Sequence, residues 1–261
     1  MSDASCLALD RVSPCRRPEG RAAGHQTWEN LLFVHYTFPA EVVRPLVPAD
    51  LDLDLWRGEA WVGIVPFEMK HIRPAFVPIG LDFLETNLRT YVHRRGEPGV
   101  FFFSLEASSL LAVEAARFGW GLPYFHADMS TTREGDRVRY ETRRRGASPP
   151  VRATFEYSVG AALGTSQAGT LEHFLLERYY LFTVTNGGDG KPGRVGKGQV
   201  HHLAYPAHEA TLHATHDDLM VAAGLPRTER APSAVHFSPG VEVEVFGPWD
   251  EPEAAEPDGP A

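Results

Sequence analysis

Hydrophobic and polar positions alternate in many short runs along this chain, and this period is typical of β-strands. The clearest run is ETNLRTYV, residues 85–92. As a strand, it places Glu85, Asn87, Arg89 and Tyr91 on one face and a mainly apolar set on the other. A polar face of this kind either contacts solvent or lines an internal site, and the remainder of the chain bears on that choice.

The same alternation predicts about a dozen short strands separated by turns. Residues 29–38 form the first of them, residues 51–70 a hairpin with RGE at its turn, and residues 85–93 a strand followed by VFFFSLEA. Later strands are predicted at LPYFHADMSTT, RVRYETRR, VRATFEYSV, LFTVT, QVHHLAY, EATLHAT, AVHFS and VEVEVF.

Three segments have helical character instead, at residues 39–47, 108–119 and 169–180. Ser108 or Ser109 can cap the start of the second helix and Gly119 can end it, while Thr170 can cap the third. Many strands with few helices predict a mainly β (α+β) fold, an antiparallel sheet closed or nearly closed into a barrel or cone with the helices outside.

Composition limits the folded part to one domain at residues 26–249. Residues 1–25 lack periodicity, and residues 250–261 are acidic and rich in proline, so both ends are predicted to be disordered tails. A Gly-rich segment, NGGDGKPGRVGKG, is predicted to be a mobile loop, since it lacks the spacing and the strand-to-helix context of a phosphate loop.

Charge and cysteine content exclude several classes of protein. The net charge of −9 argues against a nucleic-acid binder. No apolar run is long enough to span a membrane, and the first residues lack the apolar core of a secretion signal. Cys6 and Cys15 are the only cysteines, so a cytoplasmic protein without a disulfide framework is expected. The oligomeric state stays open, a homo-oligomer included.

The polar face of residues 85–92 is the first candidate site. The next segment, VFFFSLEA, is apolar on both faces through Phe103, as expected for a strand inside a sheet. The neighbouring polar row then lines a cavity, where Arg89 can hold a carboxylate and Asn87 can donate hydrogen bonds. We expect the partner to be a small organic acid.

A second candidate lies in GWGLPYFHADM, where Tyr124, His126 and Asp128 share a strand face. A histidine can transfer protons near neutral pH. If this face meets that of Arg89, Glu85 and His126 divide the acid and base roles, while Tyr91 and Tyr124 orient the substrate.

A metal site is a weaker alternative. His201 and His202 are adjacent and point to opposite faces of a strand, so one at most joins His126 and Glu85. Neither a H-x-H pair nor a helical H-x3-H pair accompanies them, and the prediction is therefore no metal and no cofactor.

The motifs AWVGIVPFEM, LETNLRTYV, GVFFFSLEAS, GLPYFHADM, GTLEHFLLERYYLF and GQVHHLAYP, within residues 26–246, resemble those of the YqjF-like uncharacterised family. That family is placed in the acetoacetate decarboxylase superfamily. The resemblance implies a cone-like β-barrel with outer helices and an interior cavity, in which Arg89 and Glu85 are counterparts of the superfamily's arginine and glutamate.

The decarboxylase forms a Schiff base between a lysine amine and a keto acid. We place the superfamily's lysine pair near GWGLPYFHA, which contains no lysine, and expect His126 near that position. Lys70, Lys191 and Lys197 match no motif. Schiff-base decarboxylation is therefore not expected. A lyase- or isomerase-type enzyme acting on a small keto acid, a non-catalytic ligand binder or sensor, and a metal-dependent enzyme stay open in that order.

Overall fold

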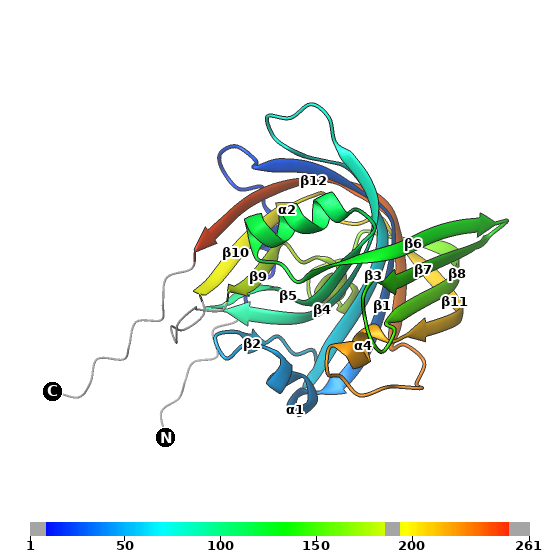
Figure 1. Cartoon of the computed structure of the whole chain (residues 1–261). Helices are drawn as coiled ribbons and strands as arrows, with labels where there is room; N and C mark the ends of the chain where they lie inside the picture. The colour runs from blue at the N-terminus through cyan, green and yellow to red at the C-terminus, as the bar shows by residue number, and fades with distance from the viewer. Residues whose placement is uncertain (1–8, 186–193, 251–261) are drawn as a thin grey trace, which may run out of the picture.

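A computed structural model describes residues 9–185 and 194–250 of the chain. Within these residues, twelve strands form one sheet that closes in a ring, with few helices outside it (Figure 1). The predicted mainly β fold class is confirmed.

Short helices lie between runs of consecutive strands along the chain. The helices are α1 (Ala40–Val43), α2 (Leu110–Trp120), α3 (Leu171–Leu176) and α4 (Leu219–Ala222), with 3-10 turns at Ser13–Cys15 and Arg44–Leu46. The strands are β1 (Gly24–Pro39), β2 (Asp52–Leu53), β3 (Glu59–Pro74), β4 (Leu81–Arg94), β5 (Glu97–Ala107), β6 (Tyr124–Glu134), β7 (Arg137–Arg144), β8 (Arg152–Gly164), β9 (Tyr180–Thr185), β10 (Arg194–His201), β11 (Ala207–Asp217) and β12 (Ala234–Asp250).

The sheet closes along two paths that share strands. One ring runs β10-β9-β5-β4-β3-β1-β12 and closes through the β10–β12 pairing. The other leaves β5 through β6, β7, β8 and β11 and returns to β12. Most neighbours are antiparallel, and β5 pairs in parallel with β6 and β9.

The shared strands are buried on both faces. On β1, Leu31 and Phe33 belong to one core cluster, while Leu32 and Val34 belong to the other. This explains the unbroken apolar runs in these strands, because each face packs inside a different ring. Leu31 and Phe33 lie on the same face of the sheet as the polar row of β4.

Several predicted boundaries move. Residues 51–70 do not form a hairpin of two long strands, because β2 pairs with β4 rather than with β3. Ser109 caps α2 by accepting a hydrogen bond from the Ala112 amide at 3.3 Å, and the helix ends at Gly121, not at Gly119. The helix predicted over residues 169–180 begins after Thr170 but ends at Leu176.

Residues 9–23, expected in an N-terminal tail, contact the domain. Pro14 is buried and its carbonyl accepts a hydrogen bond from Gln199 Nε2 at 3.1 Å. Arg11 forms a bidentate ion pair with Asp54 at 2.6 and 2.9 Å. Residues 1–8, the Gly-rich residues 186–193 and residues 251–261 lie outside the described residues.

Among the helices of the described chain, none has the length and apolar character that crossing a membrane requires.

Candidate functional site

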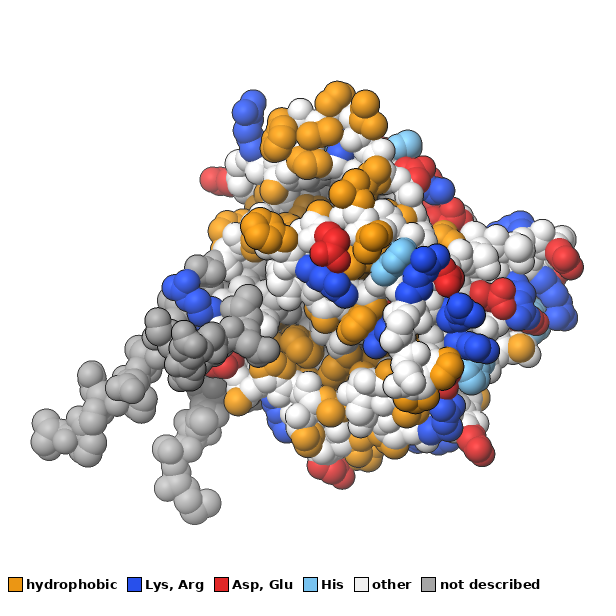
Figure 2. All heavy atoms as spheres, viewed as in Figure 1, with side chains coloured by type: hydrophobic (Ala, Val, Ile, Leu, Met, Phe, Trp, Pro, Cys, Tyr) orange, Lys and Arg blue, Asp and Glu red, His pale blue; other side chains and the backbone are white. Residues whose placement is uncertain are grey.

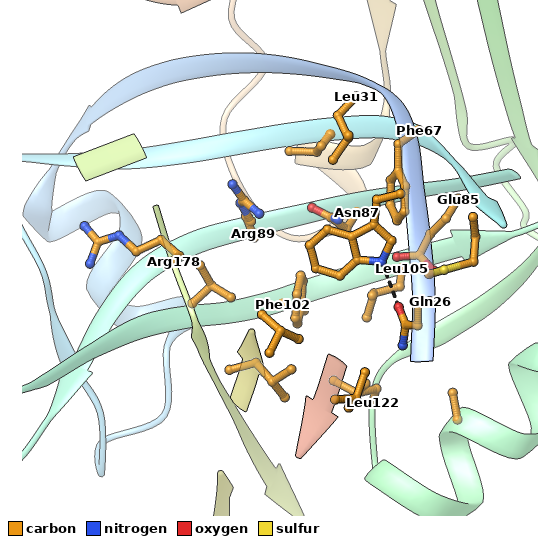
Figure 3. A pocket seen from close by; sticks show the side chains of 18 of the residues that line it. Gln26, Leu31, Phe67, Glu85, Asn87, Arg89, Phe102, Leu105, Leu122 and Arg178 are labelled. Carbon is orange, nitrogen blue, oxygen red and sulfur yellow. Dashed lines mark hydrogen bonds between the residues drawn. The ribbon is translucent and has the colours of Figure 1, made fainter. Parts of the chain in front are cut away.

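A partly open cavity of about 160 Å³ lies inside the first ring. A cavity of about 150 Å³ holds a molecule the size of benzene, so this one accommodates a ligand of similar size. Its wall is built by alternate residues of the shared strands, with apolar side chains in the majority (Figure 3). The lining includes Gln26, Trp28, Leu31, Val65, Phe67, Met69, Glu85, Asn87, Arg89, Phe102, Leu105, Leu122, Tyr124, Arg178, Tyr179 and Tyr205.

Arg89 is a buried cation at one end of this cavity. Its residue is 8% exposed, and its guanidinium lies over the rings of Phe33 and Tyr91 at 5.7 and 5.9 Å. Its Nη2 donates to the Leu175 carbonyl at 3.3 Å, while its Nε has no hydrogen-bond partner. No carboxylate of the described residues pairs with it. A buried charge without a counter-ion is unfavourable, so the site is electrostatically suited to an anion.

Arg178 lines the same end of the cavity and was missed by sequence reasoning. It follows α3 and donates from Nη1 to Asp54 at 2.7 Å and from Nε to the Phe174 carbonyl at 2.7 Å. Its Nη2 is buried without a partner. The sequence predicts a helix over residues 169–180, which gives no sign that Arg178 lines a cavity. Because α3 ends at Leu176, Arg178 lies between α3 and β9 and joins the cavity wall.

Glu85 and Tyr124 lie at the other end. The Tyr124 hydroxyl and Glu85 Oε2 are 2.8 Å apart. Burial raises the pKa of Glu85 to about 8, with the nearby Glu106 adding to the effect and the hydrogen bonds from Tyr124 and Asn87 opposing it. Burial also raises the pKa of Tyr124 well above its usual range. At neutral pH most Glu85 carboxyls are therefore protonated, and the group can exchange a proton close to neutrality.

The two ends are separated along one strand. Glu85 and Arg89 are four residues apart on β4, so their Cα atoms are about 13 Å apart. Asn87 lies between them, and its Oδ1 is buried without a partner. Figure 3 shows Arg89 and Arg178 toward one side of the cavity and Glu85 with Gln26 toward the other.

Tyr91 shares this face but does not line the cavity. Its hydroxyl donates to the Leu175 carbonyl at 2.8 Å and lies 2.7 Å from His35 Nε2. Its ring packs against Phe174, with centroids 5.1 Å apart. The residues of α3 thus fill the space beyond Arg89, which ends the cavity before it reaches Tyr91.

His126 lies outside the cavity wall, so the structure does not bring it together with Glu85. It is half-buried at the last residue pair between β6 and β5, opposite Ala107. Beyond that pair β6 leaves β5 to follow β7. Tyr124, two residues earlier, is the side chain that enters the cavity from this strand.

The other metal and lysine candidates lie elsewhere. His202 is buried against Tyr179 and Tyr205, with ring centroids 4.5 and 4.6 Å away, and burial lowers its pKa to about 4. Within the described residues, no group of three or more His, Cys, Asp or Glu side chains could hold a metal. Lys70 pairs with Glu68 and Lys197 with Glu97, and neither lines the cavity. Lys191 lies outside the described residues.

The ring-shaped sheet with its interior cavity defines an acetoacetate-decarboxylase-like fold. Acetoacetate decarboxylase from Legionella pneumophila superposes with a TM-score of 0.61 at 17% identity, covering 96% of this chain and 97% of that one. The enduracididine biosynthesis enzyme MppR complexed with pyruvate has a TM-score of 0.59 at 14% identity, covering 89% and 91% of the two chains.

The chain belongs to the DUF2071 family of uncharacterised conserved proteins, whose model matches residues 25–242. It is 38% identical to the uncharacterised protein YqjF of Bacillus subtilis over 172 residues, which are 64% of this chain and 70% of YqjF. The resemblance found in the sequence is therefore confirmed at the level of family and fold.

Proposed function

We propose that this protein binds a small organic acid in the cavity, with the carboxylate against Arg89 and Arg178. The observation that carries this proposal is the buried Arg89 guanidinium, which has a free Nε donor and no carboxylate partner in the described chain. A bound carboxylate supplies the missing charge and accepts from donors that are otherwise unsatisfied. The neighbouring Arg178 Nη2 offers a further donor.

A keto acid is the ligand class that fits the opposite end of the cavity. Ionised Glu85 can remove a proton from a carbon next to the ketone, and the C–H electron pair then forms the enolate. The Tyr124 hydroxyl can donate a hydrogen bond to the enolate oxygen. When the proton on Glu85 has exchanged with water, its delivery to the same carbon gives isotope exchange. In a keto acid with a C=C bond beside the deprotonated carbon, delivery of the proton to the far end of the conjugated enolate moves the double bond and gives isomerisation. The fold neighbour MppR, whose structure contains pyruvate, supports a keto acid as the ligand class.

This chemistry uses no Schiff base. In the described residues the cavity wall has no lysine, and Tyr124 stands in the segment where the superfamily's lysine pair was placed. Glu85, whose carboxyl can cycle between its two protonation states near neutral pH, supplies the acid–base function in the proposal.

A non-catalytic ligand binder or sensor is the second candidate. The absence of a lysine from the described residues of the cavity wall favours this second candidate. A fold can keep a binding cavity after its reactive group is replaced. Binding and turnover distinguish the two candidates.

The binding test compares pyruvate, acetoacetate and levulinate by isothermal titration calorimetry with the full chain. We expect at least one acid to bind. Arg89→Met should lower the affinity for that acid by tenfold or more, because a charge-assisted contact of about 1.5–3 kcal/mol is removed. Arg143→Met, on the solvent-exposed face of β7, is the matched control. Equal affinities for the parent protein and Arg89→Met would remove the basis of the proposal.

The turnover test follows deuterium exchange into the bound keto acid in D2O by NMR. An enzyme accelerates exchange at the carbon beside the ketone, and Glu85→Gln abolishes the acceleration while the acid still binds. A ligand that binds tightly but exchanges at the rate found without protein identifies the binder or sensor.

A further inference from the structure

A second chamber, of about 390 Å³, adjoins the inner cavity. It lies between α2 and the ends of β1, β3 and β4 that face this helix. Six residues line both spaces, namely Gln26, Ile72, Ala116, Trp120, Tyr124 and Val245. The two spaces therefore share a wall, and Tyr124, whose hydroxyl lies 2.8 Å from Glu85 Oε2, is part of it.

The outer chamber is apolar and opens at the surface. Phe83, Leu111, Ala112 and Ala115 contribute to its wall, and Arg73 is the single charged residue among the described residues that line it. Leu111 is 66% exposed, which places it at the mouth. Figure 2 shows hydrophobic side chains gathered on the face of the molecule that carries α2.

Polarity therefore changes in order along the path that leads from the outer chamber to the inner cavity. The path starts at an apolar mouth under α2, passes the proton-exchanging pair Glu85–Tyr124 and Asn87, and ends at Arg89 and Arg178. The Cα atoms of Glu85 and Arg89 are about 13 Å apart, and a small keto acid bound between these residues leaves the chamber under α2 unfilled. A molecule that fills the path has a carboxylate at one end and an apolar group at the other.

We infer that the ligand is a carboxylic acid with an extended apolar chain, which lies in the outer chamber while its carboxylate reaches Arg89. This inference rests on the proposed function for the carboxylate end and adds the substrate class. It assigns the chamber under α2 as the subsite that determines chain length.

The test measures the affinity of the full chain for octanoate, decanoate and dodecanoate, and for the corresponding alcohols, by calorimetry. Burial of each methylene group is worth a factor of about four in affinity. We expect the affinity for the acids to increase by about that factor with each added methylene group. Every alcohol should bind more weakly than the corresponding acid.

Variants of α2 locate the effect. Ala115→Trp places a large side chain at the chamber and should remove most of the gain with chain length, so that dodecanoate binds little better than octanoate. Ala115→Leu serves as a smaller filler if the tryptophan variant does not fold, and should reduce the gain. Glu114→Trp is the matched control, because Glu114 precedes Ala115 on the helix, is exposed and does not line the chamber.

The outcomes separate this inference from the proposal beneath it. Acids that bind in an Arg89-dependent manner, but with the same affinity at every chain length, would overturn the inference and leave the proposed function standing. Equal losses in Ala115→Trp and Glu114→Trp would also overturn it, since the gain would then not depend on the chamber. Failure of all acids to bind would reject the proposed function and the inference together.

Discussion

At the scale of single residues, Arg89 and Glu85 experience the same low-dielectric cavity with opposite results. Arg89 is a buried cation that forms no ion pair with a carboxylate of the described residues. Glu85 avoids the cost of a buried charge by taking up a proton, so its pKa rises to about 8. The cavity without ligand therefore contains a cation that no anion of the described residues neutralises.

The first prediction concerns the stability cost of Arg89. Arg89→Met removes a buried charge and replaces it with an apolar side chain of similar length. We expect the free energy of unfolding without ligand to rise by about 1–3 kcal/mol, while the proposed binding of an acid would be lost. Urea unfolding measures it, with Arg143→Met as control. A marked loss of stability would show that Arg89 already has its electrostatic partners within the protein.

The second prediction concerns pH and Glu85. The pKa of Glu85 is about 8 in the folded protein, against its usual value of 4.5. The folded state thus binds the proton more tightly, and the contribution of Glu85 to stability is complete below pH 4.5 and declines as pH rises toward about 8. Above that pH the contribution stays constant.

Glu85→Gln lacks this titration, so its stability relative to the parent protein should increase with pH across that interval, by up to about 1.4 kcal/mol per pH unit. Urea unfolding of both proteins at several pH values measures the difference, and Glu114→Gln on the surface is the control. Parallel curves for the two proteins would contradict the raised pKa.

The alternating pattern predicted part of this cavity from sequence alone. Strand period places Glu85, Asn87 and Arg89 on one face, and all three line the cavity. The same period does not predict that α3 covers Tyr91 or that β6 separates from β5 after His126. These two residues depend on contacts between distant segments, which a local period does not contain.

At the scale of elements, the residue at which a helix ends determines which polar side chains line the cavity. Arg178 joins the wall because α3 ends at Leu176, whereas the apolar pattern over residues 169–180 extends beyond that end. In α2, either Gly119 or Gly121 could have ended the helix. Gly121 does so with a left-handed backbone, at φ 62°, and its amide donates to the Arg117 carbonyl at 3.2 Å.

The third prediction compares these two glycines. Gly119 lies inside α2 with open space around its Cα, so Gly119→Ala should stabilise the protein by about 0.5–1 kcal/mol. Gly121→Ala must adopt the left-handed conformation and should destabilise by about 1–2 kcal/mol. Thermal unfolding measures both, and each variant serves as the control for the other. Effects of the same sign would contradict the observed helix end.

At the scale of the whole molecule, Asp54 connects three segments that lie far apart in the sequence. It follows β2, it pairs with Arg178 at the arginine end of the cavity, and it pairs with Arg11 from the N-terminal segment. Composition assigned residues 9–23 to a tail, because a segment without periodicity carries no sign of such a contact. One ion pair between residues 43 positions apart cannot be recognised from local sequence.

The fourth prediction follows from the different exposure of the two partners of Asp54. The Arg178 side chain is 3% exposed, while the Arg11 side chain is 24% exposed. Asp54→Asn leaves the buried Arg178 without its counter-ion and should destabilise by about 3–5 kcal/mol. Arg11→Ala should cost about 1 kcal/mol or less. Urea unfolding measures both, and similar losses for the two variants would contradict this ranking.

The double closure of the sheet has a practical consequence for protein engineering. The ring around the cavity is complete through β4, β5, β9, β10, β12, β1 and β3, so the hairpin of β6 and β7 extends outside it. The tip of that hairpin, around Gly135, is exposed to solvent. A fluorescent reporter or a fused domain inserted there leaves the wall of the cavity intact, which makes the tip a suitable attachment point for a biosensor.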